Sequence, residues 1–283
     1  MTPPAPPAAP LRADCIGDSA GGLTFDVAAR RNTGAALLVL RRRVTDAVGA
    51  ADSAADTVSL PLAPAAEGRL RAALPSSVSL PEGRWDAYAR LSDGRPRRLV
   101  PGVTDLRSLA ERTPSGLLGH VAVRIPYATR QGNLTVRSWL RAPHAEAVEL
   151  RLASGGLTVR GRVYGTQLVP GADAELRARP DDGDGGRGGG GVRRLEIAAE
   201  RTEFAFTVAY DGLAPGLWDL WLRPAGDAGP VVRLARLLDD VADKNPVLTF
   251  PRARVRTPHG PVEAGPYYTR DNDLSLAVAP LEA

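Results

Sequence analysis

The sequence predicts an all-β fold with two β-sandwich domains in tandem. Short segments of alternating apolar and polar residues recur along the chain, and turn residues separate them about every 8–12 residues. Glycine and proline supply 30 and 25 of the 283 residues, a composition that suits short strands joined by many turns. Two motifs each occur twice, which indicates that one structural unit is duplicated.

The first repeated motif reads L-x-x-G-x-W-D-x-(Y/W)-x-R and occurs around Trp85 and again around Trp218. In each copy a glycine turn opens a run of strict alternation, which is typical of a half-buried antiparallel strand. The alternation places Tyr88 and Trp221 on the face opposite the two tryptophans, which we expect in the cores. A leucine, a glycine turn and an aromatic-led strand resemble the corner before strand F of immunoglobulin-like (fibronectin III-like) sandwiches.

The second motif, P-Y-(A/Y)-T-R-x-x-(N/D)-L-(T/S)-(V/L), occurs at 126–136 and 266–276. Both copies predict a strand, a tight turn and a second strand. The later hairpin is expected to pair with the sheet of the second domain, because an isolated hairpin is marginal in water. By analogy the earlier copy closes the first domain, and its second strand leads into the next.

The order of these patterns predicts the domain boundaries. Residues 1–13 are read as a disordered Pro-rich tail, 14–125 as the first β-sandwich domain, and 126–283 as the second, which carries a Gly-rich loop at 180–191. A helix of one or two turns is expected from Thr104 or Asp105 to Glu111. Strands are expected at 23–27, 36–40, 58–62, 68–72, 84–91, 97–100, 121–125, 134–140, 147–152, 157–164, 173–178, 192–198, 203–209, 217–223 and 230–236.

Composition and charge argue against several classes of partner. The net charge is +4, but the 36 basic residues are interspersed with 32 acidic ones, which does not favour nucleic-acid binding. The single Cys15 forbids an intrachain disulfide and suits a reducing compartment. Neither a signal peptide nor a membrane span is recognised. We therefore expect a cytoplasmic protein.

The sequence offers few candidates for catalytic or metal-binding residues. The Gly-rich segment contains Asp181, Asp182 and Asp184 but lacks the terminal glutamate of a calcium-binding EF-hand loop. Residues 17–21 match G-x-S-x-G, yet this string follows a Pro-rich tail rather than a buried strand and reads as a turn. Histidine and cysteine form no cluster with metal-ligand spacing. The sequence therefore predicts no catalytic residue, no metal, no cofactor and no enzymatic activity.

Aromatic residues beside arginine are the better functional candidates. Flat aromatic rings next to guanidinium groups suit a glycan or a polyol-phosphate polymer. The alternative is that these rings join the two domains, and the sequence leaves both interpretations open. The candidate ligand-binding residues are Tyr88, Tyr127, Arg130, Trp139, Trp221, Tyr268 and Arg270.

The second motif, at 266–276 and in its copy at 126–136, resembles the accessory C-terminal β-domains of actinobacterial glycosyltransferases and CDP-glycerol glycerophosphotransferases. The resemblance implies an accessory or acceptor-binding role with a separate transferase as partner. It carries over no activity, because the chain lacks a transferase domain. The leading hypothesis is a non-catalytic tandem binding module for a glycan, a wall polymer or a partner transferase. The alternatives are a stand-alone component of a glycosyl or glycerophosphoryl transferase, and a structural scaffold.

Overall fold

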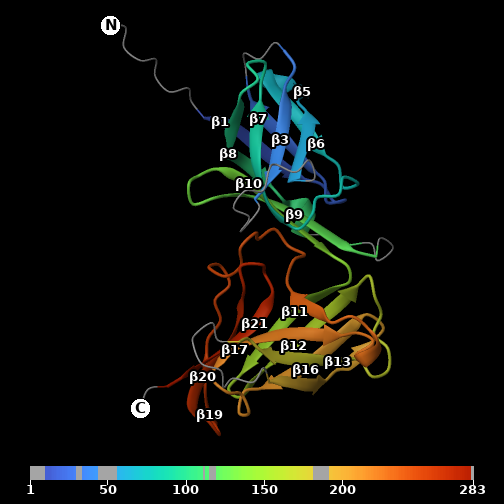
Figure 1. Cartoon of the computed structure of the whole chain (residues 1–283), viewed down its shortest axis with the longest axis vertical. Coiled ribbons are helices and arrows are strands. Elements are labelled where there is room, and N and C mark those ends of the chain that lie inside the picture. The colour runs from blue at the N-terminus through green and yellow to red at the C-terminus, as the bar shows by residue number, and fades with distance from the viewer. Residues whose placement is uncertain are drawn as a thin grey trace. The chain divides into compact units, whose positions relative to one another are not determined.

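A computed structural model describes residues 10–29, 34–43, 56–110, 112–114, 119–180 and 191–281. Its regular structure is almost entirely β-strand, so the prediction of an all-β protein is confirmed. The chain divides into two compact units (Figure 1). The first unit comprises Met1–Thr113 and Ala122–Leu140, and the second comprises Pro114–Val121 and Arg141–Ala283. No helix in the described part of the chain is long and apolar enough to cross a membrane.

The first unit is a sandwich-like sheet with the strand order β4-β3-β7-β8-β1-β2-β6-β5, and β10 joins it by pairing with β7 and with β9. One short helix, α1 (Arg107–Ala110), follows β8, as the sequence predicted. The strands are β1 (Leu11–Gly17), β2 (Leu23–Ala28), β3 (Leu37–Arg42), β4 (Thr57–Pro61), β5 (Ala63–Pro64), β6 (Arg69–Leu74), β7 (Gly83–Arg90), β8 (Pro96–Asp105), β9 (Val121–Ala128) and β10 (Leu134–Arg141).

The second unit follows the same plan, with the order β15-β16-β12-β11-β18-β17-β21-β20-β19 and with β13 between β14 and β17. The strand β19 was not anticipated from the sequence. The strands are β11 (His144–Ala153), β12 (Gly156–Tyr164), β13 (Asp173–Ala178), β14 (Val192–Glu196), β15 (Ala198–Glu200), β16 (Glu203–Ala209), β17 (Gly216–Arg223), β18 (Val232–Ala235), β19 (Ala253–Thr257), β20 (Gly260–Tyr268) and β21 (Leu274–Pro280).

The two units share their strand pairing as well as their motifs. β1 pairs in parallel with β8, and β11 pairs in parallel with β18. On one side of β7, β10 pairs with residues 83–86 and β8 pairs with 88–90. On the same side of β17, β21 pairs with residues 216–219 and β18 pairs with 221–222. Each central strand therefore changes partner half-way along one edge.

The repeated tryptophans anchor the two cores at equivalent positions, as the alternation predicted. Trp85 is fully buried and Trp218 is 8% exposed. Each indole Nε1 donates a hydrogen bond over 3.0 Å to the carbonyl oxygen four residues earlier, on Pro81 and on Ala214. A buried indole needs such a partner, so the Pro- or Gly-containing turn before the strand both positions the ring and satisfies its one donor.

Two sequence-based boundaries need correction. The tail predicted at 1–13 reaches too far, because β1 begins at Leu11 and is paired on both sides, by β2 and by β8; residues 1–9 lie outside the described residues. Burial of Cys15 in this strand raises the pKa of its thiol to about 12, so a reactive thiolate is disfavoured. The first unit extends to Leu140 rather than to residue 125, because β10 pairs with β7.

The C-terminal hairpin occupies the expected place. β20 pairs with β21, and β21 pairs with β17 of the second unit. The Gly-rich loop predicted at 180–191 falls largely on 181–190, outside the described residues; the strands on either side of it, β13 and β14, form an antiparallel pair. The strand pairing therefore confirms the expected place of the C-terminal hairpin.

Candidate functional site

The structure separates the seven candidate residues into three groups. Trp139 and Tyr268 are buried, at 0% and 1% exposure, so the expectation that they present free aromatic surfaces is wrong. Tyr268 belongs to the core of the second unit, where its ring lies 6.0 Å from that of Phe250, and Trp139 lies under the guanidinium of Arg137. Burial removes both rings from contact with an external ligand.

The remaining candidates lie at or near the surface. Tyr88, Tyr127 and Trp221 are half-buried, and Arg130 and Arg270 are exposed in the turns of the two hairpins. Tyr88 and Tyr127 come together around Arg43, which interacts electrostatically with both phenols. Around Arg179 in the second unit the corresponding phenol belongs to Tyr267 and not to Tyr268. The equivalent of Tyr127 is thus a residue that the sequence interpretation passed over.

Tyr88 and Trp221 occupy the same position in the two units, each between two guanidinium groups. The Cζ atoms of Arg41 and Arg98 lie 5.4 and 5.0 Å from the centre of the Tyr88 ring. Those of Arg177 and Arg233 lie 5.0 and 5.1 Å from Trp221. These are cation–π distances, so part of each aromatic face is already occupied by the protein itself.

An aspartate sits beside each ring, where the central strand changes partner. Asp86 accepts a bond over 2.6 Å from Arg98 on β8 and one over 2.9 Å from Thr135 on β10. Asp219 accepts a bond over 2.6 Å from Arg233 on β18 and one over 3.0 Å from Ser275 on β21. Each carboxylate therefore ties together the two strands that share one edge of β7 or β17, which is a structural role.

The ion pairs of Asp219 predict that the second unit loses stability in acid. Burial alone would raise the pKa of Asp219, but Arg233, Arg179 and Ser275 outweigh it and hold the pKa below its usual value. The carboxylate therefore stabilises the folded state fully above the unfolded pKa, near pH 4, and this contribution disappears as the pH falls through the lower folded pKa.

Replacing Asp219 by Asn should lower the unfolding free energy of the second unit at pH 7 by about 1–3 kcal/mol. It should also flatten the dependence of that free energy on pH below about pH 4, because the titrating group is gone. Urea unfolding at pH 7, 4 and 2.5 measures both effects. Parallel pH profiles for the parent and the variant would contradict this account of Asp219.

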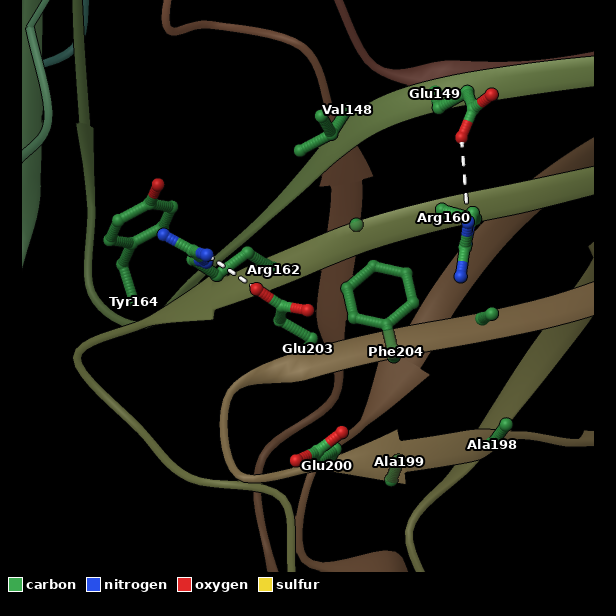
Figure 2. Close-up of a pocket in the computed structure, with 12 residues that line it drawn as sticks. Val148, Glu149, Arg160, Arg162, Tyr164, Ala198, Ala199, Glu200, Glu203 and Phe204 are labelled. Atoms are coloured by element: carbon green, nitrogen blue, oxygen red, sulfur yellow. Dashed lines mark hydrogen bonds and ion pairs between the residues drawn. The ribbon is translucent and has the colours of Figure 1, made fainter.

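The second unit also has a pocket of about 720 Å³ on its surface, lined by residues of β11, β12, β15 and β16. Figure 2 shows Phe204 between two groups of polar side chains, Arg162 with Glu203 and Arg160 with Glu149, while Glu200 lies apart from both. The lining residues are Val148, Glu149, Arg160, Gly161, Arg162, Tyr164, Ala198, Ala199, Glu200, Glu203, Phe204 and Ala205.

Tyr164 is held in place by the neighbouring strand. Its ring stacks beside that of His144, its partner across the β11–β12 pair, with centroids 6.3 Å apart and planes at 20°. His144 is buried and its Nε2 lies 2.7 Å from a carboxylate oxygen of Glu146, which also accepts the backbone N–H groups of Leu237 and Leu238. Burial raises the pKa of the Tyr164 phenol, so the ring keeps its hydroxyl proton at neutral pH. The ring is therefore a fixed, neutral platform at the pocket.

Two ion pairs flank the pocket. Arg162 pairs with Glu203 at one side, and Arg160 lies 3.9 Å from Glu149 at the other. Between them the strand β12 carries Gly161, where a Cβ atom would come within 2.4 Å of the Phe204 ring and 2.3 Å of a backbone oxygen. Only glycine fits this position, so the Phe204 ring can approach the backbone closely.

The charged side chains that flank the pocket are exposed and paired with one another. The carboxylates of Glu149 and Glu203 are 42% and 62% exposed, and each faces a guanidinium group. Such pairs offer donors and acceptors at fixed spacing to a ligand with several hydroxyl groups. In the described part of the chain no three His, Cys, Asp or Glu residues are grouped to hold a metal ion.

Sequence reasoning missed this pocket. The alternation Arg160-x-Arg162-x-Tyr164 does place three polar or aromatic side chains on one face of the expected strand 157–164. Their partners Glu149 and Glu203 come from β11 and β16, whose register against β12 cannot be read from alternation alone. The chain matches no known family model, and a search of curated proteins finds no similar sequence.

Proposed function

We propose that this protein is a non-catalytic binding module of two immunoglobulin-like β-sandwich domains, and that its second domain binds a glycan in the pocket around Tyr164. The strand orders β1-β2-β6-β5 and β4-β3-β7-β8 support the fold, because they match the A-B-E-D and C′-C-F-G sheets of that class. The tryptophan-centred turns before β7 and β17 support it further, since they correspond to the corner before strand F.

The observation that carries the ligand class is the combination of an aromatic platform with two flanking ion pairs. A sugar ring has apolar C–H faces that pack on an aromatic side chain, and a rim of hydroxyl groups that pair with carboxylates and guanidinium groups. Tyr164 supplies the platform at one end of the pocket, next to the Arg162–Glu203 pair, and Arg160–Glu149 supplies polar groups at the other end. An open pocket of this size accommodates a short stretch of polysaccharide.

Binding is favoured over glycoside hydrolysis. A hydrolase requires one carboxyl group kept protonated near neutral pH by an apolar environment, next to a second that stays ionised. Glu149 and Glu203 are both exposed and both paired with arginine, so neither lies in the apolar environment that a catalytic acid requires. We accordingly propose an accessory role beside a separate transferase, in line with the resemblance of the two hairpin motifs.

Glycan binding by the parent protein, tested by calorimetry against a panel of soluble polysaccharides, is expected to depend on Tyr164. Replacing Tyr164 by Ala should weaken binding about tenfold or more, because truncation of a central aromatic anchor typically costs 2 kcal/mol or so. Thr158→Ala is the matched control, since Thr158 lies on the same face of β12 as Tyr164 but does not line the pocket, and its hydroxyl pairs with that of Thr207. A panel without any binder, or equal loss in both variants, would refute the proposal.

A further inference from the structure

The clusters around Tyr88 and Trp221 share a geometry but differ in charge. In the second unit Arg177 stacks on Trp221 and is held by Glu175, with Nε 2.8 Å from the carboxylate. Glu175 is only 2% exposed and also binds Arg223 at 2.8 Å. Arg177, Arg223 and Arg233 on this face thus each form an ion pair with a carboxylate of the protein.

Strand register identifies the counterpart of each residue in the first unit. Arg177 is opposite Asp219 in the β13–β17 pair, and Arg41 is opposite Asp86 in the β3–β7 pair. By the same register Glu175 is opposite Trp221, and Val39 is opposite Tyr88. The carboxylate that neutralises Arg177 is therefore replaced by an isopropyl group in the first unit.

Because Val39 stands where the second unit has Glu175, the cluster around Tyr88 carries excess positive charge. Arg41, Arg43 and Arg98 gather around Tyr88 and Asp86, and this one carboxylate is shared by Arg43 and Arg98. Arg41 has no ion-pair partner among the described residues, and its buried Nε lacks a hydrogen-bond acceptor there. A buried donor without an acceptor is costly, so the cluster is incomplete as it stands.

We propose that the cluster of Arg41, Arg43 and Arg98 in the first unit binds a phosphate group. Among the described residues, three guanidinium groups against one carboxylate leave two positive charges, which match the charge of a phosphate monoester. Guanidinium forks suit tetrahedral oxyanions, and a phosphate would give Arg41 the anionic partner that it lacks among the described residues. The half-buried position of Arg41 and Tyr88 lowers the local dielectric and strengthens the attraction. This site is independent of the pocket around Tyr164.

The test is calorimetric titration of the full chain with inorganic phosphate and, separately, with glycerol 3-phosphate. One phosphate per chain should bind, and the affinity should fall as sodium chloride is raised. Arg41→Gln should reduce the affinity about tenfold or more, the size of effect that loss of a charge-assisted hydrogen bond produces. Tighter binding of the ester identifies a phosphorylated ligand, whereas equal binding identifies free phosphate; either preference supports the site.

Two further variants keep the outcome decisive. Arg177→Gln removes the equivalent arginine of the second unit and should leave phosphate binding unchanged, because that face is already neutralised. Val39→Glu introduces the carboxylate that the second unit carries and should abolish binding while Arg41 remains. If the Val39→Glu variant does not fold, the comparison of phosphate affinity between Arg41→Gln and Arg177→Gln decides the question. Absence of phosphate binding by the parent, or equal losses in these two arginine variants, would overturn the proposal.

Discussion

Replacing Trp85 by Ala should destabilise the first unit by about 3–5 kcal/mol, and Trp218→Ala should do the same to the second. Both indoles are buried, so truncation removes apolar burial and leaves a cavity within close-packed cores. It also leaves the carbonyl oxygens of Pro81 and Ala214 without the indole donor. Urea unfolding followed by hydrogen exchange, read separately over peptides of the two units, measures each loss.

The controls separate the ring from its hydrogen bond. Trp→Phe at either position retains most of the apolar volume and should cost clearly less than Trp→Ala. Trp221→Ala, on the opposite face of the same strand as Trp218 and only half-buried, should likewise cost less than Trp218→Ala. If Trp218→Ala proves as mild as Trp221→Ala, the alternation of β17 does not place the core where the structure has it.

The fold was largely predictable because apolar and polar residues alternate in its central strands, so the buried and the exposed face of each can be told apart. The glycine turn and strict alternation around Trp85 and Trp218 fixed which side chains enter the core, and the structure confirms both. The same reasoning failed for β1, since Leu11 follows a Pro-rich stretch and its strand is recognisable only from its pairing with β2 and β8. Pairing between distant segments is not visible in local patterns.

The candidate residues were harder to predict because burial of an aromatic depends on what covers it. In β10 alternation fails: the residues from Leu134 to Trp139 are buried on both faces, so Trp139 could not be assigned by period. In the pair Tyr267-Tyr268 the motif fixed a strand but not which ring faces inward. The platform Tyr164 depends on His144 and Glu146, a support that forms only when β11 pairs with β12.

Ending the chain after Gly265 should destabilise the second unit by several kcal/mol and abolish its cooperative unfolding, while the first unit unfolds as before. The truncation removes all of β21, which pairs with β17 along one half of its edge. It takes away the buried side chains of Leu274 and Leu276, together with the Ser275 hydroxyl that Asp219 accepts. Hydrogen exchange over peptides of each unit, with circular dichroism for the transition, measures the effect.

Ending the chain after Leu281 instead is the matched control, because it keeps β21 and the bond from the Leu281 N–H to the carbonyl oxygen of Pro261. This shorter truncation should unfold at the same urea concentration as the parent. The contrast follows from the shared edge of β17. Without β21, the backbone groups of residues 216–219 lose their partners, Asp219 loses the Ser275 hydroxyl, and a sheet edge is left open. Equal stability of the two truncated chains would show that the hairpin adds nothing to the second unit, and would refute its place in the sheet.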